Sequence, residues 1–164
     1  GGTVRSFHGV QVETESIPGP QEHIDFVLVP GGIGTRALAD DEEYLGWLVA
    51  LVKRSQYVLS VCTGSGVLAA AGILDGRRAT SNKMAFDWAR SQGPKVEWVG
   101  KARWVVDGTC YTSSGVSAGI DMSLAFIRDR LSEEYARRIA NAIEYTWNSE
   151  SDDDPFAVDL EGEE

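Results

Sequence analysis

Two short apolar runs, each ended by a tight turn, place the strongest constraint on how this 164-residue chain can fold. Residues 25–29 (DFVLV) lead into a Pro-Gly-Gly turn at 30–32, and residues 57–61 (YVLSV) lead into Cys62. Short runs of this kind are typical of strands buried on both faces of a parallel sheet. Residues 64–71 are small or aliphatic, which predicts a helix packed closely against that sheet.

Helical patterns lie between and after these runs. Asp40 and Glu43 resemble a capping box with an aspartate as the cap, and the apolar spacing that follows predicts an amphipathic helix. We expect further helices near 84–91, over 115–131 and from about 133 to 147.

Further strands are predicted over 96–99, 103–106 and 109–112. The Asp107-Gly108 dipeptide between the last two predicts a hairpin. Because strands and helices alternate, the fold class is α/β with a mainly parallel sheet, and the hairpin is an antiparallel excursion. We expect a single domain over residues 1–148, followed by a loosely ordered acidic tail over 149–164.

Charge and cysteine content argue against several classes of function. The 25 acidic side chains exceed the 15 lysines and arginines, and the net charge of −10 argues against electrostatic binding to nucleic acid or to an anionic membrane. Two cysteines and two histidines, scattered along the chain, give neither a disulfide framework nor zinc-ligand spacing. No apolar run approaches the ~20 residues that span a bilayer, and the N-terminus has no apolar signal core. We therefore expect a cytoplasmic protein with reduced thiols, which permits a reactive cysteine.

Cys62 is the most informative residue of the chain. Small residues stand two positions before and after it (SVCTG, 60–64), between a strand and a helix, as in the G-x-S-x-G nucleophile elbow. A sharp strand-to-helix turn strains the backbone of the nucleophile and crowds its neighbours, so the neighbours must be small. The turn also aims the side chain at the helix N-terminus, where amides and the helix dipole favour a thiolate. We predict a reactive thiol here, the alternative being a buried, inert cysteine.

The glycine-rich turn at 30–34 (PGGIG) allows two interpretations. Gly32, Gly34 and Ala37 match the dinucleotide fingerprint G-x-G-x-x-A, but residues 54–62 lack the acidic residue that this fingerprint needs for the ribose. The interpretation that we favour is an oxyanion hole formed by glycine amides beside Cys62. Both turns follow buried strands, and ligands of α/β proteins bind at the carboxyl ends of such strands.

A third segment, 112–121 (TSSGVSAGID), leads from a strand into a helix with small residues that permit close backbone approach. Taken alone, it is consistent with helix capping by Ser113 or Ser114. Four ordered segments together resemble the ThiJ/PfpI superfamily, also described as class I glutamine-amidotransferase-like. The segments are VLVPGG (27–32), SVCTGS (60–65), LDGRRAT (74–80) and TSSGVSAGID (112–121). The resemblance covers about residues 4–147 and looks closest to the isocyanide hydratase branch, which also supplies sensor domains of certain AraC-type regulators.

The resemblance implies a flavodoxin-like three-layer sandwich, usually a homodimer, that acts on a small molecule without a metal or organic cofactor. It implies that Cys62 is the nucleophile, with the Thr63 hydroxyl nearby. We expect anion-binding backbone at Gly31, Gly32, Ile33 and Thr63, and pocket residues at Asn82, Ser114 and Gly115. In isocyanide hydratases the thiolate attacks the isonitrile carbon, and water then resolves the thioimidate to an N-substituted formamide.

The chain departs from the family pattern in two places. Asn82 stands where many members carry a histidine, and an amide can orient a ligand but cannot act as a base. Family members also open with a strand-helix-strand unit before the segment that begins here at Thr3, and the first strand of that unit ends near an acidic proton donor. We expect this missing unit to be a separate or cleaved N-terminal chain, or a part of the natural protein that the sequence does not record.

Two other functions stay open. The first is glyoxalase or deglycase chemistry on a small dicarbonyl, which would use the same thiol. The second is a non-catalytic thiol redox-sensing or ligand-sensing domain, because an activated thiolate is readily oxidised. Whether the chain is an enzyme is therefore not settled by its sequence, although the elbow favours one. We interpret Cys110 as an ordinary strand thiol and Asp121 as structural.

Overall fold

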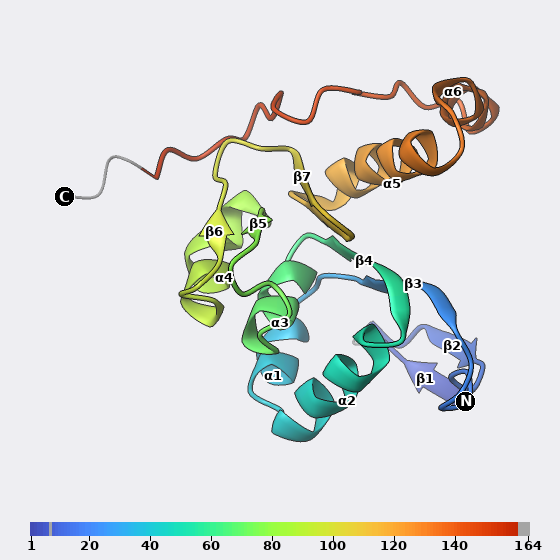
Figure 1. Cartoon of the computed structure of the whole chain (residues 1–164), viewed down its shortest axis with the longest axis vertical. Coiled ribbons are helices and arrows are strands. Elements are labelled where there is room, and N and C mark those ends of the chain that lie inside the picture. The colour runs from blue at the N-terminus through green and yellow to red at the C-terminus, as the bar shows by residue number, and fades with distance from the viewer. Residues whose placement is uncertain (7, 161–164) are drawn as a thin grey trace.

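A four-stranded sheet in the order β3-β4-β8-β7 forms the centre of the fold in a computed structural model that describes residues 1–6 and 8–160 (Figure 1). The strands are β3 (Ile24–Val29), β4 (Ser55–Val61), β8 (Cys110–Ser113) and β7 (Trp104–Asp107). The first three are parallel, and β7 runs antiparallel to β8. Val29 pairs with Ser60, and Ser60 pairs with Thr112, so the carboxyl ends of the parallel strands meet at one edge.

Helices cover both faces of this sheet (Figure 1). One face carries α1 (Thr35–Ala39), α2 (Glu42–Val52) and α3 (Gly64–Ala70), with the 3-10 turn η1 (Lys83–Ala85) and α4 (Phe86–Gln92) beside α3. The other face carries α5 (Val116–Arg130), against which α6 (Glu133–Ala142) packs. Two small ladders complete the fold: β1 (Gly2–Arg5) with β2 (Gln11–Thr14), and β5 (Arg78–Ala79) with β6 (Glu97–Trp98).

Alternating side chains of β4 fill two separate cores. Val58 points into a core with Val67 and Leu68 of α3, whereas Leu59 points into a second core with Tyr111 and Met122. This alternation explains why residues 57–61 read as continuously apolar, since a strand between two helical layers buries both faces. The predicted α/β class, the mainly parallel sheet, the three layers and the Asp107-Gly108 hairpin are confirmed.

Two helix boundaries differ from the sequence-based prediction. Asp41, not Asp40, caps α2, because its carboxylate accepts a hydrogen bond from the Tyr44 amide at 3.0 Å. The last helix was expected to reach about residue 147 but ends at Ala142. Beyond it the chain turns through Glu144, whose φ is 53°, and the Asn148 amide then reaches the buried carboxylate of Asp121 at 3.0 Å.

The acidic segment 149–160 packs against the domain. The prediction of a loosely ordered tail is therefore wrong for these residues. The Ser151 carbonyl accepts a hydrogen bond from the Arg103 amide at 2.7 Å, and the Val158 amide donates to the Gly100 carbonyl at 3.1 Å. The Asp154 side chain is 1% exposed. The remainder of the predicted tail, 161–164, lies outside the described residues.

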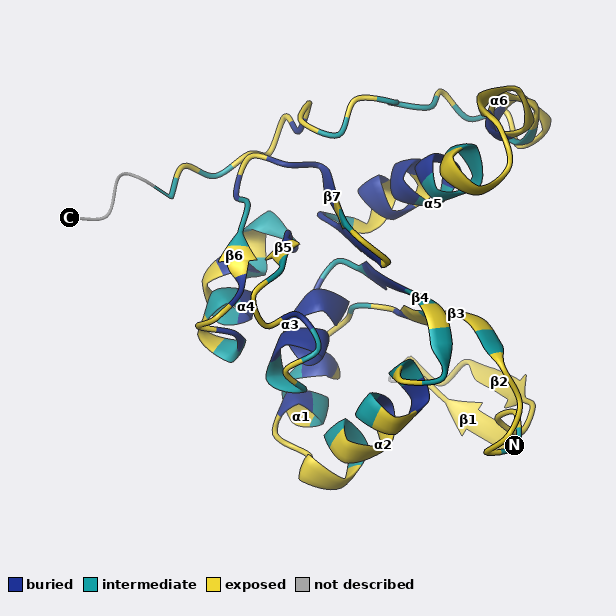
Figure 2. Cartoon of the chain, viewed as in Figure 1, coloured by how far each residue is buried: buried dark blue, intermediate teal, exposed yellow. Residues whose placement is uncertain are grey.

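The two edge strands of the sheet, β3 and β7, each pair with a single strand among the residues that the structure describes. At the β3 edge, β4 is that single partner. Phe26 and Leu28 of β3 are 49% and 43% exposed, although Phe26 still touches the ring of Phe126 on α5. The β1–β2 hairpin is exposed along both strands (Figure 2). Within the described part of the chain, no helix is long and apolar enough to cross a membrane.

Gly64 is required where α3 starts against the end of β3. A Cβ atom there would lie 2.2 Å from the Val29 carbonyl oxygen. We therefore expect Gly64→Ala to lower the free energy of unfolding by about 3 kcal/mol. The matched variant Gly46→Ala, inside α2 with open space around its Cβ, should instead gain about 0.5–1 kcal/mol. Urea unfolding of both variants tests this, and equal stabilities would contradict the close approach.

Candidate functional site

Cys62 lies at the turn between β4 and α3 with a left-handed backbone conformation, φ 58°. Non-glycine residues rarely adopt this conformation, and it costs about 1–2 kcal/mol. Hydrogen bonds hold the turn: the Cys62 amide donates to the Ser113 carbonyl at 3.2 Å, and its carbonyl accepts from the hydroxyls of Ser65 and Ser81, both at 3.1 Å. The thiol is half-buried. The backbone thus has the geometry expected of a nucleophile elbow.

The glycine turn after β3 lies directly against this elbow. A Cβ on Gly31 would lie 2.7 Å from the Cβ of Cys62 and 2.8 Å from the Thr63 amide nitrogen. Gly32 has a φ of 135°, which a side chain would disfavour. The two turns that the sequence placed at one sheet edge are therefore in contact, and only a glycine at position 31 permits that contact.

The Thr63 hydroxyl ties the two turns together. It accepts hydrogen bonds from the Gly32 amide at 3.0 Å and from the Thr35 hydroxyl at 3.1 Å. The Arg36 guanidinium donates to the Thr35 hydroxyl at 3.1 Å and also lies 3.7 Å from the ring centre of Trp88. The Gly32 amide therefore already donates a hydrogen bond within the protein. The amides of Ile33 and Thr63 donate no hydrogen bond within the described residues.

Asn82, Ser114 and Gly115, which we expected to line a pocket, do lie together around a cavity of about 200 Å³. Its other lining residues are Lys83, Met84, Arg103, Ser117, Asp154 and Phe156. Cys62 is not among them. Two residues that hydrogen-bond the Cys62 backbone, Ser81 and Ser113, are followed directly in the chain by the lining residues Asn82 and Ser114.

Sequence reasoning missed Thr35, Lys83, Arg103 and Asp154. No spacing signal identifies them, because the contacts that place them (with Thr63, Ala102, Asp121 and Lys83) join residues far apart in sequence, and Asp154 lies within an acidic run. Arg103 donates from Nε and Nη2 to the same oxygen of Asp121, at 2.8 and 2.6 Å, and Asp121 is fully buried. This supports a structural role for Asp121. Within the described ranges, no carboxylate hydrogen-bonds the Cys62 thiol.

Lys83 is a buried amine beside this cavity. Its Nζ donates to the Thr80 hydroxyl at 2.8 Å and the Ala102 carbonyl at 2.7 Å, and lies 3.7 Å from an Asp154 oxygen. Burial lowers the pKa of Lys83 to about 8, although the Asp154 carboxylate opposes the shift.

The lowered pKa predicts how the contribution of Lys83 to stability depends on pH. Below about pH 8 the amine is charged in both the folded and the unfolded chain. Between about pH 8 and the pKa of Lys83 in the unfolded chain, the unfolded chain still holds a proton that the folded chain has released, so the free energy of unfolding rises with pH. The stability of wild type relative to Lys83→Met should therefore rise by about 1 kcal/mol between about pH 7 and about pH 9. The exposed Lys95→Met variant is the control. Urea unfolding checks this, and a relative stability that falls with pH would contradict the burial of a charged amine.

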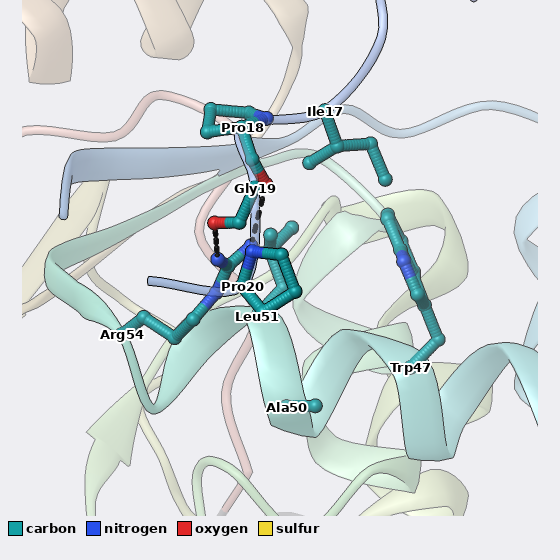
Figure 3. Close-up of a pocket in the computed structure, with 8 residues that line it drawn as sticks. All are labelled: Ile17, Pro18, Gly19, Pro20, Trp47, Ala50, Leu51 and Arg54. Carbon is teal, nitrogen blue, oxygen red and sulfur yellow. Dashed lines mark hydrogen bonds between the residues drawn. The ribbon is translucent and has the colours of Figure 1, made fainter. Parts of the chain in front are cut away.

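A larger cavity, about 490 Å³, lies between the loop at 17–20 and α2 (Figure 3). Trp47 and Ile17 line it, and Arg54 donates hydrogen bonds to the carbonyls of Pro18 and Gly19. None of the site residues predicted from the sequence lines it. Among the residues that the structure describes, no three His, Cys, Asp or Glu side chains lie close enough together to hold a metal ion.

A cysteine in a left-handed strand-to-helix turn, with a glycine turn against it at the carboxyl edge of a parallel sheet, defines a class of α/β proteins with a thiol at a nucleophile elbow. The chain belongs to the DJ-1/PfpI family, whose model matches residues 1–129.

Three curated relatives show how diverse similar proteins are. The chain is 37% identical to the isonitrile hydratase of Pseudomonas putida over 74% of its own length and 52% of the relative. It is 34% identical to the HTH-type transcriptional regulator CdhR of Pseudomonas aeruginosa, over 77% of its length and 37% of the regulator. It is 32% identical to the deglycase PH1704 of Pyrococcus horikoshii, over 73% of its length and 70% of that protein.

A solved structure supports the same assignment. A ThiJ/PfpI family protein from Pseudomonas syringae superposes with a TM-score of 0.71 at 32% identity, covering 93% of this chain and 60% of that protein. The chain thus spans little more than half the length of the isonitrile hydratase and of this structure.

Proposed function

We propose that this chain carries the catalytic cysteine of an isonitrile hydratase, with Cys62 as the nucleophile. The single observation that carries the proposal is the strained backbone of Cys62, φ 58°, at the carboxyl edge of the sheet. Such strain persists only where the surrounding structure enforces it, and it clusters at functional sites. The similarity to the P. putida isonitrile hydratase supports the choice of substrate.

The proposed reaction adds water across the isonitrile carbon. The Cys62 sulfur forms a bond to that carbon while a proton is delivered to the same carbon, which gives a thioimidate, R–N=CH–S. Water then adds to the thioimidate carbon, the C–S bond breaks, and the thiol is regenerated with an N-substituted formamide as product. The sum is one isonitrile plus one water to one formamide.

Backbone amides around the elbow would stabilise the charge that develops in both steps. We assign this role to Gly31, Ile33 and Thr63, because the Gly32 amide already donates to the Thr63 hydroxyl. The Thr63 hydroxyl holds the glycine turn in place beside the sulfur through that contact and its contact with Thr35. Thr63 therefore acts both through its backbone and as a positioning residue.

We propose that the proton donor comes from a polypeptide segment that adds a strand to the exposed edge of β3. A strand added parallel to β3 would end at the same edge of the sheet as Cys62, so a carboxylate at its end would approach the sulfur. The half-exposed Phe26 and Leu28 on β3 support an additional covering element. We also propose that the protein acts as a homodimer, since the exposed β1–β2 hairpin would gain from burial.

Dicarbonyl chemistry is the second candidate, favoured by the similarity to a deglycase over 70% of that protein. Both candidates use the same thiol, so the test compares substrates. We expect an alkyl isonitrile to give its formamide, followed by NMR, and methylglyoxal to be consumed no faster than by Cys62→Ser. Faster methylglyoxal consumption without formamide would assign the chain to the deglycase type. No turnover of either, in the presence of a peptide spanning the added strand, would favour a non-catalytic sensing domain.

A further inference from the structure

The cavity of about 200 Å³ beside the elbow has a wall that comes from the C-terminal segment. Asp154 and Phe156 line it together with Asn82, which precedes η1, and Gly115, which precedes α5. A Cβ on Gly115 would lie 3.8 Å from Asn82 Nδ2, so these two residues are neighbours in the cavity wall. The volume corresponds to about seven non-hydrogen atoms, taking for each about 30 Å³, the share of one water molecule in the liquid.

Asp154 fixes the C-terminal segment in this position. Its oxygens lie 3.7 Å from Lys83 Nζ and 3.9 Å from Arg103 Nη1. The carboxylate also accepts a hydrogen bond from the Phe156 amide at 3.1 Å, so the residue that anchors the segment also orients Phe156.

The charges that line the cavity neutralise one another. Lys83 and Arg103 provide two positive charges, and Asp154 with Asp121 behind it provides two negative ones. An anionic ligand group would have to lose its hydration although both cations already face carboxylates, and a cationic group would lie beside Lys83 and Arg103. An uncharged group is therefore the better occupant.

The rim of the cavity is apolar and exposed. Phe156 is 69% exposed, and Met84 is 99% exposed. Large apolar side chains exposed beside a hollow are typical of ligand-binding positions, and methionine adapts its shape to different ligands.

We propose that this cavity binds the uncharged, apolar substituent of the molecule that reacts at Cys62, and that Phe156 determines which substituents fit. The proposal rests on the proposed function for its reacting thiol. The cavity is lined by Asn82 and Ser114, each the chain neighbour of a residue that hydrogen-bonds the Cys62 backbone, which supports placing the substituent there. The C-terminal segment is thus part of the substrate site, with Phe156 as a specificity-determining residue.

The test measures the alkylation of Cys62 in the full chain by two iodoacetamides, in which the thiol sulfur bonds to the reagent carbon as iodide leaves. We expect N-butyl iodoacetamide to label the Cys62 peptide about tenfold faster than iodoacetamide. Phe156→Ala should lower this ratio to about twofold, because the butyl group loses its apolar contact. Phe26→Ala, which removes an exposed phenylalanine on β3, is the matched control and should leave the ratio unchanged.

Two further arms complete the test. N-(3-carboxypropyl) iodoacetamide should gain no rate, because its charge has no free partner in the cavity. An unchanged ratio in Phe156→Ala, or an equal loss in Phe26→Ala, would overturn the proposal. A tenfold wild-type ratio in a protein that turns over no isonitrile would support the pocket and contradict only the proposed function.

Discussion

Replacing Cys62 with serine should lower isonitrile turnover about a thousandfold or more, because the serine hydroxyl is far less nucleophilic than the thiol and has no base beside it. Cys110→Ser should stay close to wild type. Cys110 is buried in β8 in a separate part of the sheet, and burial raises the pKa of its thiol, which keeps it protonated and unreactive. The assay is formamide formation followed by NMR at equal protein concentrations.

The serine variant is a fair comparison because it preserves the shape of the elbow. Serine has the same Cβ branch as cysteine, so the left-handed backbone at position 62 is strained equally in both proteins. Matching circular dichroism spectra and melting temperatures would show that the fold is retained. Turnover at the wild-type rate in Cys62→Ser would refute the assignment of Cys62 as the nucleophile. Loss of turnover in Cys110→Ser alone would identify Cys110 as the nucleophile.

Asp121→Ala should produce the largest loss of stability of any single substitution proposed, about 3–5 kcal/mol. The substitution leaves the Arg103 guanidinium, whose side chain is 10% exposed, without the carboxylate that accepts two of its hydrogen bonds. It also removes the carboxylate oxygen that accepts from the Asn148 amide and the Tyr145 hydroxyl, so the chain beyond α6 loses two of its hydrogen bonds to α5. Urea unfolding followed by tryptophan fluorescence measures the loss.

The control for this prediction is Asp25→Ala, which removes a carboxylate that is 88% exposed and 3.9 Å from His23. Exposed ion pairs contribute about 0–1 kcal/mol, so this variant should unfold almost as wild type does. A loss in Asp121→Ala no greater than in Asp25→Ala would show that the buried pair does not hold the C-terminal part of the domain in place.

Local patterns were sufficient to predict the sheet and the elbow. The runs 25–29 and 57–61 are apolar because helices cover both faces of their strands, and that burial leaves a direct trace in the sequence. The glycines also leave a direct trace in the sequence, because close backbone contacts between the two turns require Gly31 and Gly64. For the same reason, the juxtaposition of the two turns could be inferred from the parallel order of their strands.

Contacts between distant residues could not be predicted in the same way. Asp154 ends a run of seven charged or polar residues (148–154) that is typical of a solvated segment, yet it is buried beside Lys83 and Arg103. The chain beyond α6 likewise hydrogen-bonds Asp121, more than twenty residues upstream, and no local pattern in the sequence predicts that contact. Charged side chains gave no periodic signal, because their partners come from other elements and not from their own helix or strand.

The central claim is that the Cys62 sulfur bonds to the substrate carbon, and trapping that bond tests it most directly. Wild-type protein is mixed with an alkyl isonitrile, quenched rapidly in the cold during turnover so that the thioimidate is kept, and mapped by tandem mass spectrometry. The predicted result is an added mass of one isonitrile on the Cys62 peptide, with Cys110 unmodified. Formamide production with the adduct on another residue, or undiminished in Cys62→Ser, would contradict the claim.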